Sequence, residues 1–180
     1  MQPSPYLKRR DRARRGTARA LVLVGAALAG ACIERPELTV PTAEEVEGSY
    51  ASVTELDAEI RGNVVEITVV QSANQLRRGG SLWARVGPYI YLFTEETQRL
   101  FRDFPGLAGV RVATRTAGGV AVANAMLTRD ELSGVLWRRA LNIAGQARRD
   151  GTERPRLLEA LIRWGEEHTE FEYSESFTPR

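Results

Sequence analysis

The sequence contains one cysteine and one histidine among its 180 residues, and no lysine after Lys8. A single thiol excludes a disulfide framework within the chain and any zinc site that needs several cysteine ligands. Catalysis that pairs a serine or cysteine with an imidazole must use His168, because the chain has no other histidine. The lack of lysine after residue 8 excludes Schiff-base chemistry and a phosphate-loop lysine from the rest of the chain.

Nucleotide-binding glycine motifs are also missing, since no Gly-x-Gly-x-x-Gly follows a predicted strand. The glycine pairs 79–80 and 118–119 are better interpreted as turns. We therefore expect no catalytic residues, no cofactor and no metal ligands. A hydrophobic content of 43% nevertheless supports a packed core and excludes a fully disordered chain.

Charge is distributed very unevenly along the chain. Residues 1–31 hold seven basic side chains and one acid, which leaves 18 basic and 22 acidic side chains in residues 32–180. The first segment therefore carries +6 and the remainder −4, an asymmetry typical of a targeting segment in front of a domain. The negative remainder also argues against a nucleic-acid partner, whose affinity depends on neutralising phosphates.

The basic segment is followed by an uncharged apolar run, residues 20–31. Twelve helical residues span about 18 Å, which is less than the ~30 Å hydrocarbon core of a bilayer. A basic start, a short apolar run and small residues at its end are typical of a secretory signal peptide. The arginine pairs 9–10 and 14–15 could indicate twin-arginine export, but neither is followed by the usual Phe-Leu.

The end of the apolar run reads Leu28-Ala29-Gly30-Ala31-Cys32. This stretch resembles the lipobox of bacterial lipoprotein signal peptides. The resemblance implies cleavage between Ala31 and Cys32 and a diacylglyceryl group on the Cys32 thiol. It also implies that Ile33, in place of aspartate, favours the outer membrane if the source has one. A soluble secreted protein and an uncleaved signal anchor are the alternatives.

The sequence thus predicts four segments. They are a signal peptide over residues 1–31, a lipidated N-terminus and flexible tether over 32–52 with room for a helical turn near Thr42–Glu47, one domain over 53–175 and a tail over 176–180.

Hydrophobic periodicity in the domain predicts two β-hairpins, one over 53–69 with a turn at 61–63 and one over 110–126 with a turn at 117–119. Helical spacing predicts a helix over 94–104, while residues 82–93 fit either a helix or a strand. A capping box at Thr128–Glu131 predicts the start of a second helix, a third begins near Thr152, and a short strand covers 170–173. The expected order is ββαββααβ, an α+β fold of two layers in which helices cover one face of an antiparallel sheet of four to five strands.

Four groups of side chains are candidate sites. His168 has acidic neighbours in sequence, but positions adjacent on a helix end do not converge on a metal, so we interpret it as a favourable last-turn residue. Glu95 and Glu96 are interpreted as complementing a helix dipole. The arginine pairs could contact lipid headgroups. The aromatic residues could line a binding surface, although a core role is expected for most of them; they are Trp83, Tyr89, Tyr91, Phe93 and Trp137. The pairs are 77–78, 138–139, 148–149 and 154 with 156.

We therefore expect an exported, lipid-anchored envelope protein that faces the periplasm or the cell exterior. It would bind or assemble with a protein partner and not catalyse a reaction. One alternative is a carrier or sensor of a small apolar ligand held between sheet and helices. The other is an envelope hydrolase that uses carboxylates alone.

Overall fold

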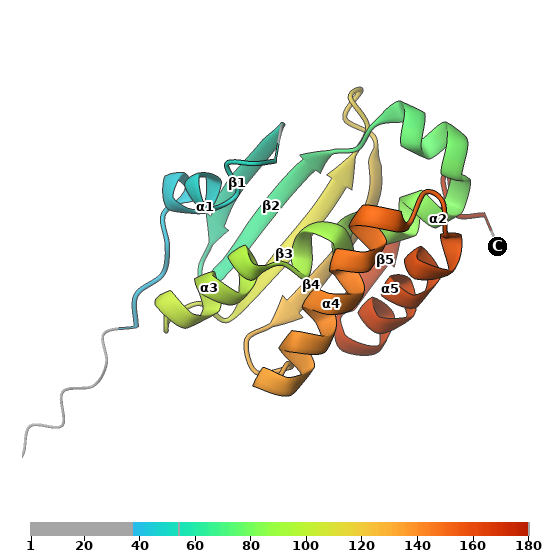
Figure 1. Ribbon diagram of the computed structural model, residues 1–180. Coiled ribbons are helices and arrows are strands. Elements are labelled where there is room, and N and C mark those ends of the chain that lie inside the picture. Colours follow the sequence, from blue (N-terminus) through green and yellow to red (C-terminus); the bar gives the residue numbers. More distant parts are fainter. Residues whose placement is uncertain (1–37, 54, 180) are drawn as a thin grey trace, which may run out of the picture. The chain divides into compact units, whose positions relative to one another are not determined.

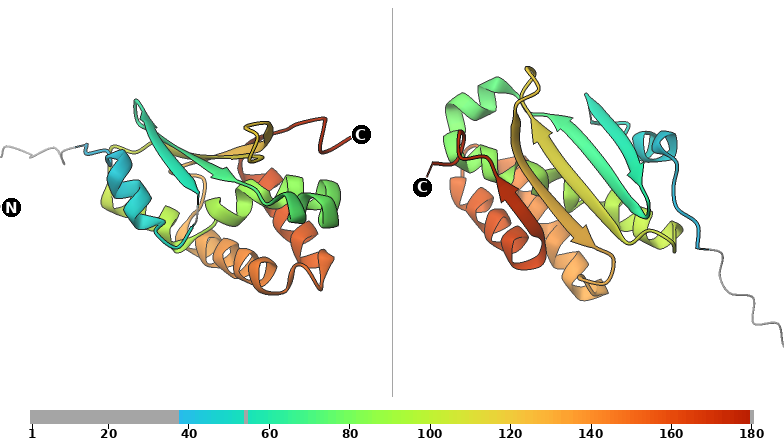
Figure 2. Two further views of the ribbon diagram at one scale, coloured as in Figure 1. Left: turned by 90° about the horizontal axis from the view of Figure 1, so that it is seen from above. Right: turned by 180° about the vertical axis from the view of Figure 1, so that it is seen from behind.

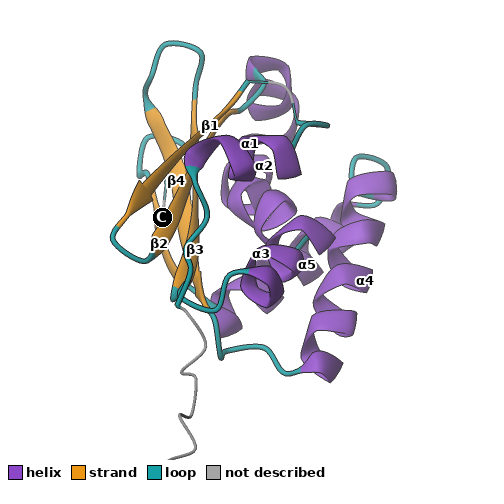
Figure 3. Cartoon of the chain, turned by 90° about the vertical axis from the view of Figure 1, so that its left-hand side faces the viewer, coloured by secondary structure: helices purple, strands orange, loops and turns teal. Residues whose placement is uncertain are grey.

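The computed structural model describes residues 38–53 and 55–179. One β-sheet forms one layer of this part of the chain, and the helices pack against one face of it (Figures 1 and 3). The α+β class predicted from the sequence, with helices on one face of the sheet, is confirmed. Cys32, the predicted signal peptide and the start of the predicted tether lie outside the described residues.

The sheet has five strands in the spatial order β1-β2-β3-β4-β5. Three neighbouring pairs are antiparallel, as predicted, but β2 and β3 run parallel. A parallel pair needs a crossover connection, and α2 and α3 provide it between these two strands. The strands are β1 (Leu56–Arg61), β2 (Val64–Val70), β3 (Gly109–Arg115), β4 (Ala121–Thr128) and β5 (Glu170–Tyr173).

The chain enters the domain earlier than the sequence predicted. Thr42 and Glu45 form a capping box that starts helix α1 (Ala43–Ser49). Val46 and Tyr50 are buried in the main core, and the Glu47 carboxylate accepts a hydrogen bond from the Ala58 amide on β1. The prediction of a flexible tether up to residue 52 is therefore wrong for residues 43–50, because two apolar contacts and an edge-strand contact fix them.

Residues 82–92 are helical and belong to α2 (Ala73–Leu92), and Phe93 follows as its C-cap. Their β-favouring aromatic residues pack as a buried helix between the sheet and the outer helices, so tertiary packing overrides local propensity. The helix is kinked at Gly80, whose φ of 53° and ψ of −139° are accessible to glycine and strained for other residues. Figure 2 shows α2 running beneath the sheet from its first, outlying turns.

The other helices are α3 (Glu95–Asp103), α4 (Gly134–Asp150) and α5 (Pro155–His168). The prediction that Thr128 caps the second helix is wrong, because Thr128 is the last residue of β4 and pairs with Gly109. Ser133 caps α4 instead, through its side-chain oxygen and the Leu136 amide. The helix predicted near residue 152 begins at Pro155, at a position where the missing amide hydrogen costs nothing.

The main hydrophobic core lies between the sheet and the helices. Val65, Ile67 and Val69 point into it from β2, whereas Glu66 lies on the other face of the sheet. On that face Glu66 is paired with Arg61 at 3.2 Å and with Arg111 at 3.0 Å. The alternation of the strands thus places apolar side chains under the helices and charged ones on the opposite face.

Candidate binding site

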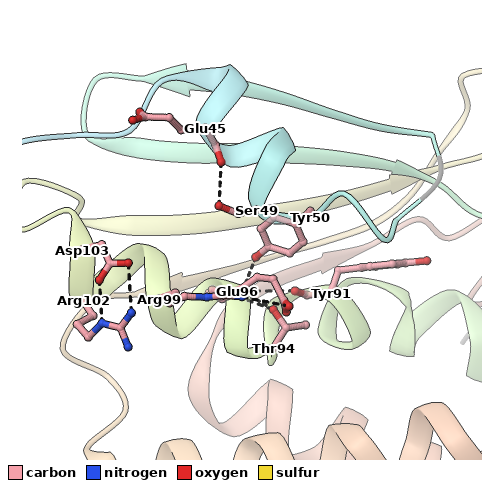
Figure 4. Close-up of polar contacts among 10 residues, drawn as sticks. Glu45, Ser49, Tyr50, Tyr91, Thr94, Glu96, Arg99, Arg102 and Asp103 are labelled. Atoms are coloured by element: carbon pink, nitrogen blue, oxygen red, sulfur yellow. Dashed lines mark hydrogen bonds and ion pairs between the residues drawn. The ribbon is translucent and has the colours of Figure 1, made fainter.

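A half-open cleft of about 450 Å³ lies where the α1–β1 connection, the α2–α3 junction and α4 meet. Aromatic and hydroxyl side chains form much of its lining, and charged groups stand on α3 and α4. Figure 4 shows Tyr50 reaching from the end of α1 towards Thr94 at the start of α3, with Tyr91 and Glu96 beside them. The lining residues are Tyr50, Ser52, Val53, Ile90, Tyr91, Thr94, Glu95, Glu96, Leu141, Gly145, Arg148 and Arg149.

A buried chain of hydroxyl groups fixes the position of Tyr50. Its phenol oxygen is 2.5 Å from the Thr97 hydroxyl, which is 3.2 Å from the Thr94 hydroxyl. Thr94 also caps α3, because its oxygen accepts from the Thr97 amide. Tyr50 is only 2% exposed, and burial raises its pKa to about 12, against the lowering effect of the Thr97 and Thr94 hydrogen bonds.

This pKa predicts a loss of stability in alkali. The unfolded phenol ionises near its ordinary pKa of 10.0 while the folded one stays neutral up to about 12, so stability present below pH 10 is lost as the pH rises between these values. The loss due to Tyr50 should be on the order of 2–3 kcal/mol at about 1.4 kcal/mol per pKa unit.

Urea unfolding at pH 8 and pH 12 measures this loss. The variant Tyr50→Phe should lose less stability than the parent over the same interval, by that amount. An equal loss in both proteins would show that Tyr50 does not carry the effect.

Arg148 forms one wall of the cleft and is anchored to the protein backbone. Its guanidinium donates to the carbonyl of Ile90 at 2.6 Å and to that of Phe93 at 3.5 Å, and so caps the last turn of α2. Burial lowers the pKa of this guanidinium, an effect that Glu96 and Glu95 oppose and Arg149 reinforces. Arg149 follows on the same helix end and also lines the cleft.

Glu95 and Glu96 stand in the first turn of α3, as the sequence predicted, and line the same cleft. Glu96 accepts a bond from Arg99 at 3.5 Å on its own helix. The ion pairs within 4.0 Å among the described residues include none between these glutamates and Arg148 or Arg149. The cleft thus presents acidic and basic groups that are not joined to each other.

A smaller pocket of about 130 Å³ shares Ile90, Tyr91 and Arg148 with the cleft and is also lined by Gln71 and Trp83. Gln71 directly follows β2 and is 5% exposed. Its amide nitrogen donates to the Trp83 carbonyl at 2.6 Å, but its oxygen has no protein partner. An unpaired buried acceptor is costly, so this oxygen marks a place where an occupant with a hydrogen-bond donor would be stabilised.

His168, the other candidate from the sequence, lies outside the cleft. His168 is the last residue of α5, as expected, and its Nδ1 lies 3.1 Å from the Glu131 carboxylate while its ring packs 4.2 Å from Trp164. This contact ties the end of α5 to the loop before α4. Residues 38–53 and 55–179 contain no group of three or more histidine, cysteine, aspartate or glutamate side chains suited to a metal.

The arginine pairs have separate roles. Arg139 lies over the Trp164 ring at 4.8 Å, and Arg154 lies 3.9 Å from Asp150. Arg77 bonds to Asn74 on the first turns of α2. Only the pair 148–149 lines the cleft.

Gln71 and Tyr50 were not identified from the sequence. A polar residue between a strand and a helix cap is the signal that could have indicated Gln71. Tyr50 gave no such signal, because the segment around it was interpreted as a tether. Of the aromatic residues considered, Trp83 and Tyr91 line the pockets, while Tyr89, Phe93 and Trp137 belong to the core, as expected for most of them.

No helix within the described part of the chain is long and apolar enough to cross a membrane. Comparison with known protein families, with curated proteins and with solved structures finds no match for this chain.

Proposed function

We propose that this protein is exported, anchored to a membrane through lipid on Cys32, and acts by binding a ligand in the cleft between α2, α3 and α4. The anchor is supported by the basic segment, the short apolar run and the lipobox-like stretch that ends at the only cysteine. Binding is supported by one observation above all, the unpaired oxygen of buried Gln71, a residue that lines the smaller pocket next to the cleft, which shares Tyr91 and Arg148 with it.

The attachment of Thr39 to the domain determines how far an anchor on Cys32 could lie from it. The Thr39 carbonyl accepts a hydrogen bond from the Gly106 amide at 2.8 Å, so the described chain is already held to the domain there. Only residues 33–37 separate Cys32 from Leu38. Six extended residue steps cover at most about 20 Å, so acyl chains on Cys32 would hold the domain close to the bilayer surface.

The variant Cys32→Ser tests the anchor. A serine hydroxyl does not accept the diacylglyceryl group, so we expect the variant to lose incorporation of labelled fatty acid and its attachment to washed membranes. Two acyl chains give stable attachment, whereas a protein without them has none of comparable strength.

The matched control is Ile33→Val, which changes the neighbouring residue and keeps the thiol. It should label and fractionate like the parent. Labelling of Cys32→Ser at the parental level would contradict the proposal.

The alternative of an apolar carrier has less support. The core beneath α2 and α3 is filled, since Tyr89, Leu92 and Phe93 are 0% exposed. The space that is present is bordered by charged and hydroxyl groups. Glu95 and Glu96 do not support the carboxylate-only hydrolase, because they lie on one turn of one helix and do not face each other across a cleft.

A further inference from the structure

The charged groups that line the cleft indicate what kind of ligand it binds. This inference rests on the proposal that the cleft binds a ligand. Arg148 and Arg149 contribute positive charge from the end of α4, and Glu95 and Glu96 contribute negative charge from the start of α3. The two sets share one cleft without forming an ion pair across it within 4.0 Å.

The backbone holds the charged groups at separate positions. Arg148 is bonded to the carbonyls of Ile90 and Phe93, so its guanidinium cannot swing to α3 without leaving those carbonyls unpaired. Glu95 and Glu96 follow Thr94, which caps α3 and so fixes the start of this helix. The Thr94 hydroxyl is also part of the buried series of hydroxyl groups that includes Tyr50. A ligand that joins the two sides must therefore bring its own opposite charges.

The smaller pocket next to the cleft has a neutral hydrogen-bond acceptor in its lining residue Gln71. The Gln71 oxygen is buried and has no protein partner, and Gln71 lines the smaller pocket, which shares Tyr91 and Arg148 with the cleft. An amide N–H of a ligand would satisfy it. Arginine forks bind carboxylates well, and carboxylates bind ammonium groups through charge-assisted hydrogen bonds.

We propose that the cleft binds a zwitterionic peptide, with the ligand carboxylate on Arg148 and Arg149, its ammonium group on Glu95 and Glu96, and an amide N–H directed to Gln71. The volume of about 450 Å³ is within the usual range for small-molecule sites and accommodates a dipeptide.

Titration calorimetry of the purified full chain tests this assignment, with alanyl-alanine as the probe. Three derivatives are compared with it: the N-acetylated, the C-amidated and the doubly blocked dipeptide. Each single block removes one charge and should weaken binding about tenfold or more, as expected for one lost charge-assisted contact. Trp83 lines the smaller pocket, so its fluorescence gives a second readout of ligand binding.

Two variants assign each charge to its wall. Arg149→Gln should weaken the free dipeptide and leave the C-amidated form unaffected. Glu95→Gln should weaken the free dipeptide and leave the N-acetylated form unaffected. The matched controls Arg138→Gln and Glu153→Gln change exposed residues that do not line the cleft, and they should bind like the parent.

The possible outcomes separate this inference from the proposed function. Binding that ignores both blocks and both variants overturns the zwitterion assignment. Binding of the neutral apolar dye N-phenyl-1-naphthylamine without binding of the dipeptide overturns the assignment and keeps a binding role. If neither probe binds, both the assignment and the proposed role of the cleft are overturned. An unmodified Cys32 overturns only the anchor.

Discussion

Gly165→Ala should destabilise the domain by about 2–3 kcal/mol or more, even though alanine is the better helix former by about 1 kcal/mol. A Cβ at this position on α5 would lie 2.4 Å from two ring carbons of Tyr89. Carbon atoms normally approach to about 3.5–4.0 Å. One of the two helices must therefore shift.

The Tyr89 ring cannot easily move away. It is 0% exposed, and its hydroxyl lies 2.7 Å from that of Tyr173, which in turn donates to Glu166 at 2.9 Å. Glu166 is also paired with Arg85 at 2.5 Å. A displaced ring would break a network that joins α2, α5 and β5, so the cost includes lost hydrogen bonds as well as overpacking.

Gly145→Ala on α4 is the matched control. There the added Cβ would meet only the Arg149 side chain, at an ordinary 3.5 Å. The same substitution should therefore raise the free energy of unfolding by about 0.5–1 kcal/mol through helix propensity. Urea denaturation measures both variants, and a Gly165→Ala protein as stable as the parent would contradict the packing described for α2 and α5.

Arg129→Met should lower the free energy of unfolding by about 2–4 kcal/mol. The Arg129 guanidinium donates to the carbonyls of Leu107, at 2.5 Å, and of Phe101 and Phe104 at the end of α3. It also lies over the Phe101 ring at 5.4 Å. Methionine keeps much of the volume but leaves three carbonyls without their charged donor, each at a net cost of about 1 kcal/mol or more.

Arg102→Met is the corresponding control on α3 itself. Arg102 is 69% exposed and bonds only to the adjacent Asp103, so its loss should change stability by less than about 0.5 kcal/mol. Arg129→Lys should be intermediate, because an ammonium group lacks the planar fork that reaches several carbonyls. Equal effects of Arg129→Met and Arg102→Met would show that the three-carbonyl contact does not stabilise the domain.

The order of the five strands and of helices α3, α4 and α5 could be predicted, because most local signals agree with the fold. Gly62, with a φ of 65°, turns β1 into β2 as the sequence indicated, and the alternation of Val65, Ile67 and Val69 identifies their buried face. The apolar stripe after residue 155 predicted α5, although its start was expected near Thr152 and lies at Pro155. These signals lie within one element and need no knowledge of distant contacts.

Predictions failed where a distant contact decides the local structure. Residues 43–50 resemble a linker in composition, yet two apolar side chains and Glu47 attach them to the domain. The capping box at Thr128 is present in sequence, but Thr128 pairs with Gly109 in the sheet and Glu131 binds His168 instead. The parallel pairing of β2 and β3 likewise depends on where the α2–α3 crossover returns the chain.

The cleft, too, could be predicted only where local signals decide the structure. Glu95 and Glu96 were placed correctly at a helix start, whereas the pair Arg148–Arg149 was not distinguished from the three other arginine pairs. Their meeting in one cleft could not be derived from spacing, because it depends on the packing of α4 against the α2–α3 junction. Gln71 becomes notable only once its burial and its unpaired oxygen are known.

The central claim is that Cys32 carries the lipid that holds this protein at a membrane. The intact mass of the protein, extracted from membranes with detergent, tests it most directly. We expect a chain that begins at Cys32 and carries the added mass of a diacylglyceryl group. A chain that begins at Met1 or Gly30, or one that begins at an unmodified Cys32, would contradict the claim.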